Sequence, residues 1–479
     1  MKRSPLLIVV MLFCICCSKR NDNTENLHLD YTFLKEAGSI NPKLKGVWQS
    51  IGEGYIWDAT GDSLRLYSYT QNFCSLERNP YLESLMNASS RFVSNGPDTI
   101  SVYYLDLGEK TTLIQNKREL VRIDKLPANC KSLMEMQEAK AKPLLSFFFE
   151  TLEENYAFSQ ERNMNWTELK EKYIASVSET TSEEELFKLM GEVVSQTKDQ
   201  HTKIISKEGQ KIQYTITPSA QFTINAFNAQ SEIQDLGKYF NLFFERNYQN
   251  ISDSLLRGKG QKDANGQLEW GSLSLRIGYL NIHSFAGFAS NQLDRKTQID
   301  TLEKVMSRIV SALADKDALI VDLSFNFGGF DAACFTIASF FTDKITPVYT
   351  TQTYFRGEIY QGESLSVIPA SERTFTKPVY VLMTDISRSA AEIFAIQMKA
   401  FPNVQLVGMN TLGTQSGMLN KAIGNFQLTL SNQRYLTPDN QVYEAVGVPP
   451  DIEMEIFSDE MDVFNAHKLA VKRIMKMIE

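Results

Sequence analysis

The sequence lacks the usual signatures of metal and nucleotide chemistry. It has four histidines and six cysteines in 479 residues, yet it contains no HExxH motif, no pair of CxxC motifs and no cluster of His and Asp residues. A phosphate-binding loop and a dinucleotide-binding glycine motif are missing as well. We therefore expect no bound metal and no cofactor.

Excess positive charge is also missing. The formal net charge is −8, from 49 Lys and Arg against 57 Asp and Glu, so nucleic acid is not expected as a partner. A composition that is 43% hydrophobic and 22% charged is globular. The length suits two or three domains, and no internal repeat or low-complexity tract divides them.

The one strongly apolar stretch at the N-terminus is too short to favour a membrane-spanning helix. Residues 1–17 combine the basic start MKR with PLLIVVMLF and CICC, and polar residues follow at once. This pattern resembles a bacterial lipoprotein signal, with Cys17 as the lipidated residue and 18–30 as a tether. The resemblance implies a lipid anchor in the cell envelope, and the weakly acidic SKRNDN suits the periplasmic side of the outer membrane. An uncleaved signal anchor is the alternative.

Three cysteines remain beyond that signal. Cys74 and Cys130 both fall in the first globular segment, and export would permit a disulfide between them, although the sequence does not establish it. Cys334 lies in the apolar run AACFTIASFF, where a buried thiol of the core is expected.

Periodicity divides the rest of the chain into four segments. Residues 31–135 alternate in short runs and predict a small antiparallel β domain, in which Trp48, Trp57, Tyr67 and Tyr69 are expected in the core. Three- and four-residue spacing predicts a helical subdomain at 136–205. A connecting segment follows at 206–268, with strand-like stretches at 213–218 and 221–227 and a helix near 232–246.

The last segment, 269–479, alternates apolar strands with helices, which predicts an α/β core of mainly parallel strands. Within it, SAAEIF (389–394) follows the apolar strand pattern KPVYVLMTD (377–385). A serine at the start of a helix lies beside unpaired N–H groups and the positive end of the helix dipole, where a developing oxyanion is stabilised. Ser389 is thus a candidate nucleophile. It could equally be a simple N-cap, with Glu392 completing a capping box.

A nucleophile needs a base and oxyanion donors. The glycine turn of VDLSFNFGGF (321–330) could supply a backbone donor from Gly328 or Gly329, and the Ala390 amide the other. His201, in the polar loop DQHT, is the candidate base. Of the other histidines, His283 lies in a strand pattern and His467 in an amphipathic helix, where it is expected to be solvated.

In order and wording, seven motifs between residues 141 and 456 resemble the C-terminal processing (tail-specific) serine peptidases, and among them the tricorn-like branch. They are the helical lead-in, DQHT, IGYLNIHSF, ALIVDLSFNFGG, ISRSAAEIFA, LVGMNTLG and EAVGVPPDI. The resemblance implies a crotonase-like (ClpP-like) α/β core with a helical N-terminal subdomain, and a polypeptide substrate. No carboxylate-binding loop of a PDZ domain is recognisable in 206–268.

Carried over residue by residue, the resemblance places the nucleophile at Ser389, the base at His201 and a supporting glutamate at Glu444. The oxyanion donors fall on the Ala390 amide and on the pair Gly328–Gly329. The lysine of the serine–lysine dyad is replaced by Thr414, and Lys421 nearby belongs to no matching motif.

Two further positions depart from the family pattern. Gln200 stands where a serine often precedes the histidine, and Ser324 replaces the usual arginine before the glycine turn. A non-catalytic binder of peptides or apolar ligands, like retinoid-carrying relatives on the same core, is therefore the alternative. A second alternative is an envelope- or glycan-binding lipoprotein that acts through its β domain.

Overall fold

The computed structural model describes residues 31–77, 86, 90–104, 117–215, 217–229, 232–290, 295–458 and 462–479. The predicted lipidation site Cys17, the signal and tether at 1–30 and His28 lie outside the described residues. Among the helices in these ranges, none combines the length and the apolar character needed to cross a membrane.

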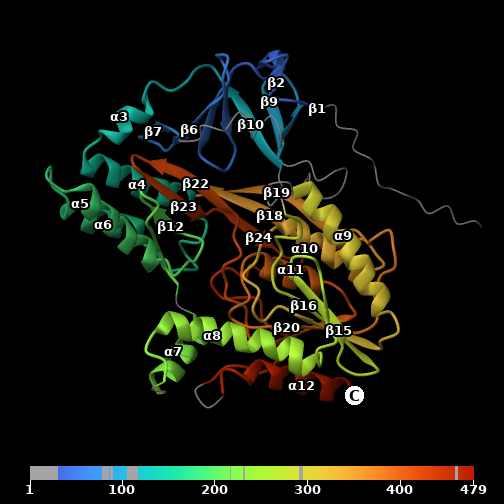
Figure 1. Cartoon of the computed structure of the whole chain (residues 1–479). Helices are drawn as coiled ribbons and strands as arrows, with labels where there is room; N and C mark the ends of the chain where they lie inside the picture. Colours follow the sequence, from blue (N-terminus) through green and yellow to red (C-terminus); the bar gives the residue numbers. More distant parts are fainter. Residues whose placement is uncertain are drawn as a thin grey trace, which may run out of the picture.

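The N-terminal β domain is a mostly antiparallel sheet, seen at the top of Figure 1. As far as it is described, the sheet has nine strands in the order β1-β8-β9-β10-β4-β5-β6-β7-β11. The four aromatic side chains predicted to be core are all less than 9% exposed, which confirms that prediction. The strands are β1 (Tyr31–Thr32), β4 (Val47–Ser50), β5 (Tyr55–Asp58), β6 (Arg65–Tyr69), β7 (Cys74–Leu76), β8 (Ser90–Ser94), β9 (Thr99–Tyr104), β10 (Lys117–Ile123) and β11 (Cys130–Lys131), beside the pair β2 (Lys35–Glu36) and β3 (Ser39–Ile40).

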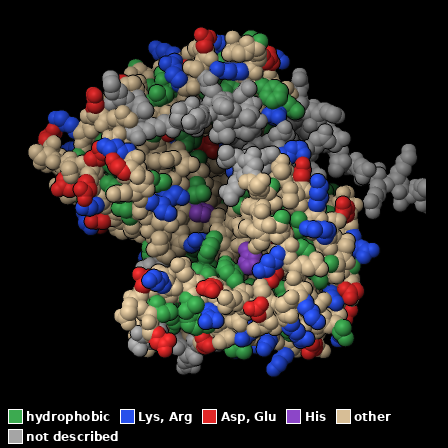
Figure 2. Space-filling model, in the orientation of Figure 1, with side chains coloured by type: hydrophobic (Ala, Val, Ile, Leu, Met, Phe, Trp, Pro, Cys, Tyr) green, Lys and Arg blue, Asp and Glu red, His purple; other side chains and the backbone are tan. Residues whose placement is uncertain are grey.

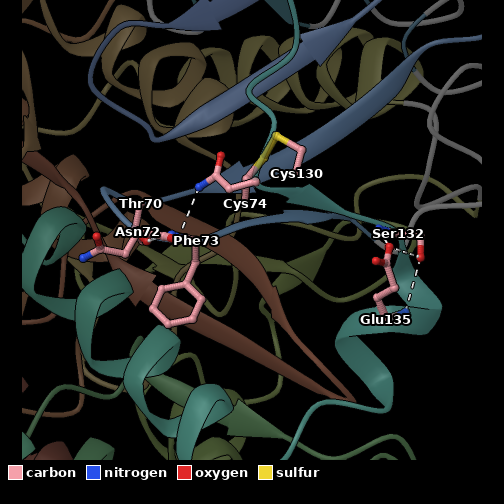
Figure 3. Close-up of a disulfide and its surroundings, with 8 residues drawn as sticks. Thr70, Asn72, Phe73, Cys74, Cys130, Ser132 and Glu135 are labelled. Carbon is pink, nitrogen blue, oxygen red and sulfur yellow. Dashed lines mark hydrogen bonds between the residues drawn. A yellow bond between two sulfur atoms is a disulfide. The ribbon is translucent and has the colours of Figure 1, made fainter.

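A disulfide joins Cys74 to Cys130 and closes the end of this sheet (Figure 3). The two cysteines face each other in the parallel pairing of β7 with β11. Next to the bridge, the ring of Phe73 stacks on Phe147 of the following helix, with 5.2 Å between ring centroids. The disulfide therefore fixes the strand that docks the β domain on the helical subdomain.

Four helices form the helical subdomain, at the left of Figure 1. The sequence S-E-E-E at 182–185 gives a capping box, in which Ser182 accepts from the Glu185 amide and Glu185 accepts from the Ser182 amide. The inner faces of the helices are apolar and bury a cluster of aromatic side chains. The helices are α3 (Leu133–Gln137), α4 (Ala141–Asn155), α5 (Trp166–Ala175) and α6 (Glu183–Gln196).

The connecting segment corrects two predictions. Among the described residues of the strand-like stretch 213–218, only Gln213 lies in a strand, and Pro218 begins a helix. The strand-like stretch at 221–227 lies inside helix α7 (Pro218–Ala229), which packs against α8 (Leu236–Gln249). Thr217 caps α7 by accepting the Ala220 amide at 3.0 Å. Phe222 and Ala226, four residues apart, share one apolar face. This helical spacing outweighs the alternation read from the sequence.

The predicted α/β core is confirmed. Its sheet has the order β14-β15-β16-β17-β20-β21-β25, parallel from β16 onwards. Alternate residues of the central strand face opposite layers: Leu319 and Val321 join the core under α9–α11, and Ile320 joins the core under α8 and α12. The strands are β14 (Gln261–Lys262), β15 (Leu268–Ser272), β16 (Ile277–Ile282), β17 (Ala318–Asp322), β20 (Val379–Met383), β21 (Val404–Gly408) and β25 (Ile452–Glu453); the helices are α9 (Arg295–Ala312), α10 (Asp331–Ala338), α11 (Ala390–Lys399) and α12 (Ala466–Ile478).

Two smaller sheets join segments far apart in sequence. The sheet β13-β12-β23-β22 pairs a strand of the helical subdomain, at Lys203–Ile205, with the hairpin at 418–431. The sheet β19-β18-β24 lies beside it (Figure 1). The core and the helical subdomain therefore share a sheet. These strands are β12 (Lys203–Ile205), β13 (Lys211–Gln213), β22 (Met418–Ile423), β23 (Phe426–Ser431), β18 (Thr346–Phe355), β19 (Glu358–Val367) and β24 (Gln433–Leu436).

The prediction that His467 is solvated is wrong. Its side chain is fully buried, and its Nε2 lies 2.5 Å from Asp322 Oδ2 at the end of β17. The Tyr279 hydroxyl donates to the same oxygen at 2.5 Å. Because α12 packs its apolar face on the sheet, this histidine becomes a structural link. Cys334 is buried as predicted.

Removing the disulfide should destabilise the β domain. The bridge spans 56 residues, and the chain-entropy model gives about 4 kcal/mol for a loop of that size. In urea titrations followed by tryptophan fluorescence, the double variant Cys74→Ala/Cys130→Ala should unfold at lower urea than wild type and should not respond to dithiothreitol. The control Cys334→Ala should keep the wild-type response. Equal midpoints for oxidised and reduced wild type would contradict this prediction.

Candidate active site

Ser389 occupies a strained turn between β20 and α11. It is the N-cap directly before α11, and its backbone has φ 57° and ψ −124°, a left-handed conformation that residues other than glycine rarely adopt. The Ser389 N–H is held twice, by Thr414 O at 2.9 Å and by Glu392 Oε2 at 3.1 Å. These bonds fix a turn that sets a half-buried hydroxyl at the start of the helix.

The glycine turn lies directly against this serine. A Cβ atom placed on Gly328 would lie 2.7 Å from Ser389 Cβ and 3.0 Å from the Ala390 nitrogen. One on Gly329 would lie 2.4 Å from the Phe285 carbonyl carbon. Both glycines also have positive φ. Only glycine fits at these two positions, so the predicted juxtaposition of the turn with Ser389 has a steric basis.

The backbone amides around the serine differ in whether they already donate a hydrogen bond within the chain. Gly328 N–H donates to Asn326 Oδ1 at 2.7 Å. Within the described part of the chain, the N–H groups of Gly329 and Ala390 donate to no acceptor. Two of the three amides named from the sequence are thus open, and an incoming oxyanion would compete with Asn326 for the third.

Glu392 does more than cap the helix. Its buried carboxylate accepts from Thr411 Oγ1 at 2.6 Å, Gly413 N at 2.7 Å and Thr414 N at 2.8 Å, in addition to Ser389 N. Burial raises the pKa of Glu392, and these donors oppose the rise. The carboxylate therefore ties the loop 411–416, which we call the support loop, to the nucleophile turn.

His201 reaches the site because the strand that follows it is paired with the core. β12 begins two residues after the histidine and runs antiparallel to β23. The buried carboxylate of Asp199 accepts from the His201 amide at 2.8 Å and from the Thr202 hydroxyl at 2.7 Å, which fixes the loop DQHT. Burial alone would raise the pKa of Asp199, but nearby Arg162 and His201 bring it below its ordinary value.

Contacts on two sides bring the histidine loop to the serine. Arg388, which precedes the serine, donates from Nη1 to Gln200 Oε1 at 2.5 Å. On the other side, the His201 ring interacts with the backbone of Ser416 in the support loop. Figure 2 shows histidine side chains in the hollow between the upper and lower parts of the molecule, with hydrophobic and basic side chains around them. The structure thus unites the two segments that the sequence places 188 residues apart.

The imidazole is set up in its neutral form. Burial lowers the pKa of His201, Asp199 opposes this, and the cations Lys203 and Arg388 add to the lowering. Among the described residues, its buried Nδ1 has no hydrogen-bond partner. A neutral imidazole can accept a proton, which is what a general base requires.

Glu444 does not contact His201 directly but holds the loop that does. Its Oε1 accepts from Arg162 Nη2 at 2.5 Å, and its Oε2 accepts from the amides of Gln415 at 2.8 Å and Ser416 at 3.1 Å. Burial raises the pKa of Glu444 to about 8, and Arg162 counteracts it. Since both oxygens only accept hydrogen bonds here, the contacts suit the carboxylate form.

The departures from the family pattern have structural explanations. Thr414 contributes its backbone carbonyl to Ser389, as described above. Lys421 lies in β22, and its amine donates to Glu53 O at 2.5 Å and Gly54 O at 2.8 Å of the β domain, which places it outside the site. Ser324 is completely buried, so its side chain cannot reach a ligand in the cleft.

Comparison with known sequences gives two family matches. Residues 276–454 match the model of Peptidase family S41, and residues 140–195 match that of the tricorn protease C1 domain. The first match spans most of the α/β core, and the second lies in the helical subdomain. The carboxy-terminal processing protease CtpA of Bacillus subtilis is 29% identical over 182 residues, which cover 38% of this chain and 35% of that relative. The chloroplastic carboxyl-terminal-processing peptidase 2 of Arabidopsis thaliana is 29% identical over 184 residues, covering 38% and 32%. The chain thus matches about a third of the length of these relatives.

Solved structures of other proteins share the fold of this chain. "A putative peptidase from Parabacteroides merdae ATCC 43184" superimposes with a TM-score of 0.57 at 20% identity, covering 71% of this chain and 97% of that one. Mature CPAF gives a TM-score of 0.51 at 12% identity, covering 71% and 97%. At such identities the likeness concerns the fold.

Sequence reasoning missed the supporting residues. Arg162, Asp199 and Asn326 hold the support loop, the histidine loop and the glycine turn, and Arg388 connects the Ser389 turn to the histidine loop. Asp199 could have been found, since it stands two residues before His201 in a polar loop. No local pattern marks Arg162, because its partner is 282 residues away.

The Arg162–Glu444 pair offers a test of this arrangement. The two side chains are 7% and 0% exposed, and removing one member of a buried pair typically costs about 3–5 kcal/mol. Arg162→Met and Glu444→Gln should each lower the free energy of unfolding by about that amount, and the double variant by clearly less than the sum. Urea denaturation of the four proteins measures this cycle. Strictly additive losses would show that the two side chains are not coupled.

Proposed function

We propose that this chain is a serine peptidase that hydrolyses peptide bonds of polypeptides, with Ser389 as the nucleophile and His201 as the general base. The observation that carries the proposal is the meeting of two loops, one with a strained serine beside open amides and the other with a neutral histidine. The Arg388–Gln200 hydrogen bond holds these loops together.

The proposed reaction follows the usual order of acyl transfer. Ser389 Oγ attacks the peptide carbonyl carbon while its proton passes to His201, and the negative charge collects on the carbonyl oxygen. His201 then gives that proton to the leaving amine, and the C–N bond breaks. Water, deprotonated by the same imidazole, releases the acyl group from the serine.

The open amide of Ala390 lies at the helix N-terminus, where it can donate to the oxyanion together with a glycine amide. One such donor is worth about 3–4 kcal/mol in the transition state. Glu444 acts in this scheme as a positioning residue, because it fixes the support loop and, through Ser416, the histidine ring.

A non-catalytic binder on the same core is the second candidate. One observation favours it: the Gly328 amide donates to Asn326 and is not free for an oxyanion. A fluorophosphonate probe separates the two candidates, because an activated serine forms a covalent adduct and a binding protein does not.

Replacement of the proposed nucleophile and base should abolish hydrolysis. Ser389→Ala and His201→Ala should each lower kcat by about 10⁴-fold or more, as in other serine peptidases, and Ser389→Ala should no longer take up the fluorophosphonate. Ser364→Ala, at an exposed position of β19, and His283→Ala, directly after β16, are matched controls, with melting temperature as the check on folding. Wild-type turnover by a folded Ser389→Ala protein would exclude the assignment.

We also propose that the chain is exported and anchored by a lipid on Cys17, on the periplasmic face of the outer membrane. The cysteine that ends a short apolar segment supports this proposal. In a bacterial host fed an alkyne fatty acid, Cys17→Ala should lose both the label and the membrane association, whereas Cys16→Ala should keep both. Label retained by Cys17→Ala would refute the assignment.

A further inference from the structure

Arg388 lies across the junction of the three segments that build the site. It directly precedes Ser389, and its guanidinium group sits over the ring of Phe327, with 4.5 Å to the centroid. Its Nη1 donates to Gln200 on the histidine loop. Phe327 belongs to the glycine turn and is 44% exposed. Arg388 is half-buried, beside the exposed ring of Phe327 and next to the turn that carries Ser389.

The charge of Arg388 is incompletely compensated: the Glu392 carboxylate acts on it electrostatically, but burial outweighs that effect and lowers the pKa of Arg388. In the described part of the chain, no carboxylate forms an ion pair with Arg388, and Gln200 takes only one of its five N–H donors. Two other arginines close to the site do pair with carboxylates: Arg162 with Glu444 at 2.5 Å and Arg434 with Glu161 at 2.7 Å. A partly desolvated guanidinium that keeps free donors beside a nucleophile is a ready acceptor for an anion.

We propose that Arg388 is a specificity-determining residue that binds a carboxylate group of the peptide next to the scissile bond. This inference rests on the proposed peptidase function and adds the substrate class. The planar guanidinium can donate two parallel hydrogen bonds to a carboxylate, while Gln200 and Phe327 hold it in place.

Ser324, which stands before the glycine turn, is completely buried and uncharged. Arg388, on the turn that follows the next strand of the sheet, places a positive charge beside the glycine turn through its contact with Phe327. The carboxylate could belong to an Asp or Glu side chain or to the C-terminus of the peptide. Both present the same chemistry to Arg388.

A bound carboxylate would also influence the base. Arg388 and Lys203 lower the pKa of His201 and Asp199 raises it, in addition to the effect of burial. A carboxylate on Arg388 would offset one of these positive charges. The imidazole of the occupied site would then bind the proton of Ser389 more strongly. Acidic substrates should therefore bind more tightly and also react faster in the chemical step.

Binding to an inactive protein tests the inference apart from catalysis. Four fluorescein-labelled peptides of one sequence would combine Glu or Gln beside the scissile bond with a free or an amidated C-terminus. Ser389→Ala protein should bind at least one carboxylate form about tenfold more tightly than its neutral counterpart, the usual order for a hydrogen bond to a charged group. Comparison of the four peptides shows whether the protein binds the Glu side-chain carboxylate or the C-terminal carboxylate.

Matched variants locate the effect. In Ser389→Ala protein, the added change Arg388→Gln should bring the acid-to-amide affinity ratio close to one, and Arg388→Lys should leave a reduced preference, because lysine lacks the planar fork. Lys203→Gln, which removes the other cation near His201, should leave the ratio unchanged. In the active chain, Arg388→Gln should move the acid limb of the kcat/KM profile to higher pH, since it removes a charge that lowers the pKa of His201.

The outcomes separate this inference from the proposed function. A carboxylate preference that depends on Arg388 in a protein without hydrolytic activity would support the inference and reject the peptidase. Hydrolysis without any acid-to-amide preference would overturn the inference alone, as would a preference that survives Arg388→Gln. If Arg388→Gln does not fold, the Arg388→Lys variant provides the test. An acid-to-amide affinity ratio equal to that of the parent protein would contradict bidentate binding by the guanidinium group.

Discussion

Two buried carboxylates hold one loop in place, and the whole site depends on them. Glu392, from the helix that begins at Ser389, binds the first half of the support loop, and Glu444 binds the second half through the amides of Gln415 and Ser416. The backbone amides of this loop donate hydrogen bonds to buried carboxylates. The loop cannot shift without leaving these buried charges without hydrogen-bond partners. The serine and the histidine both contact this loop, so its rigidity sets their relative position.

The shared sheet gives this arrangement its wider frame. The pairing of β12 with β23 ties the helical subdomain to the core, and the β domain is fastened to the same sheet. There, Lys421 donates to two carbonyl groups of the β domain, while Glu77 accepts the Ala422 amide at 3.0 Å. The β domain therefore covers the edge strand β22 instead of leaving it open to pairing. We infer that it stabilises the sheet from which the histidine loop emerges.

Local periodicity allowed the α/β core and the buried aromatic core of the β domain to be predicted. The meeting of Ser389 with the glycine turn was predicted from the resemblance to the tail-specific peptidases. Prediction from the sequence failed at 221–227, where α7 forms because packing against α8 overrides alternation, and at His467, whose burial depends on Asp322 in a distant strand. Contacts between residues far apart in the sequence, such as Arg162 and Glu444, produce no local sequence pattern. Roles that depend on such contacts become visible only in three dimensions.

In the mechanism that we propose, Thr414 stands in place of the dyad lysine and His201 takes the role of the base. A lysine base would have to lose its charge by burial, whereas an imidazole is close to neutral from the start and needs only a modest lowering of its pKa. Burial supplies that lowering, with Arg388 and Lys203 adding to it, and Asp199 limits it. A base brought in from a separate subdomain also needs anchoring on both sides, and Gln200 and Ser416 provide it. In the proposed mechanism, the contacts of Gln200 and Ser416 therefore make the position of the base depend on the assembled chain.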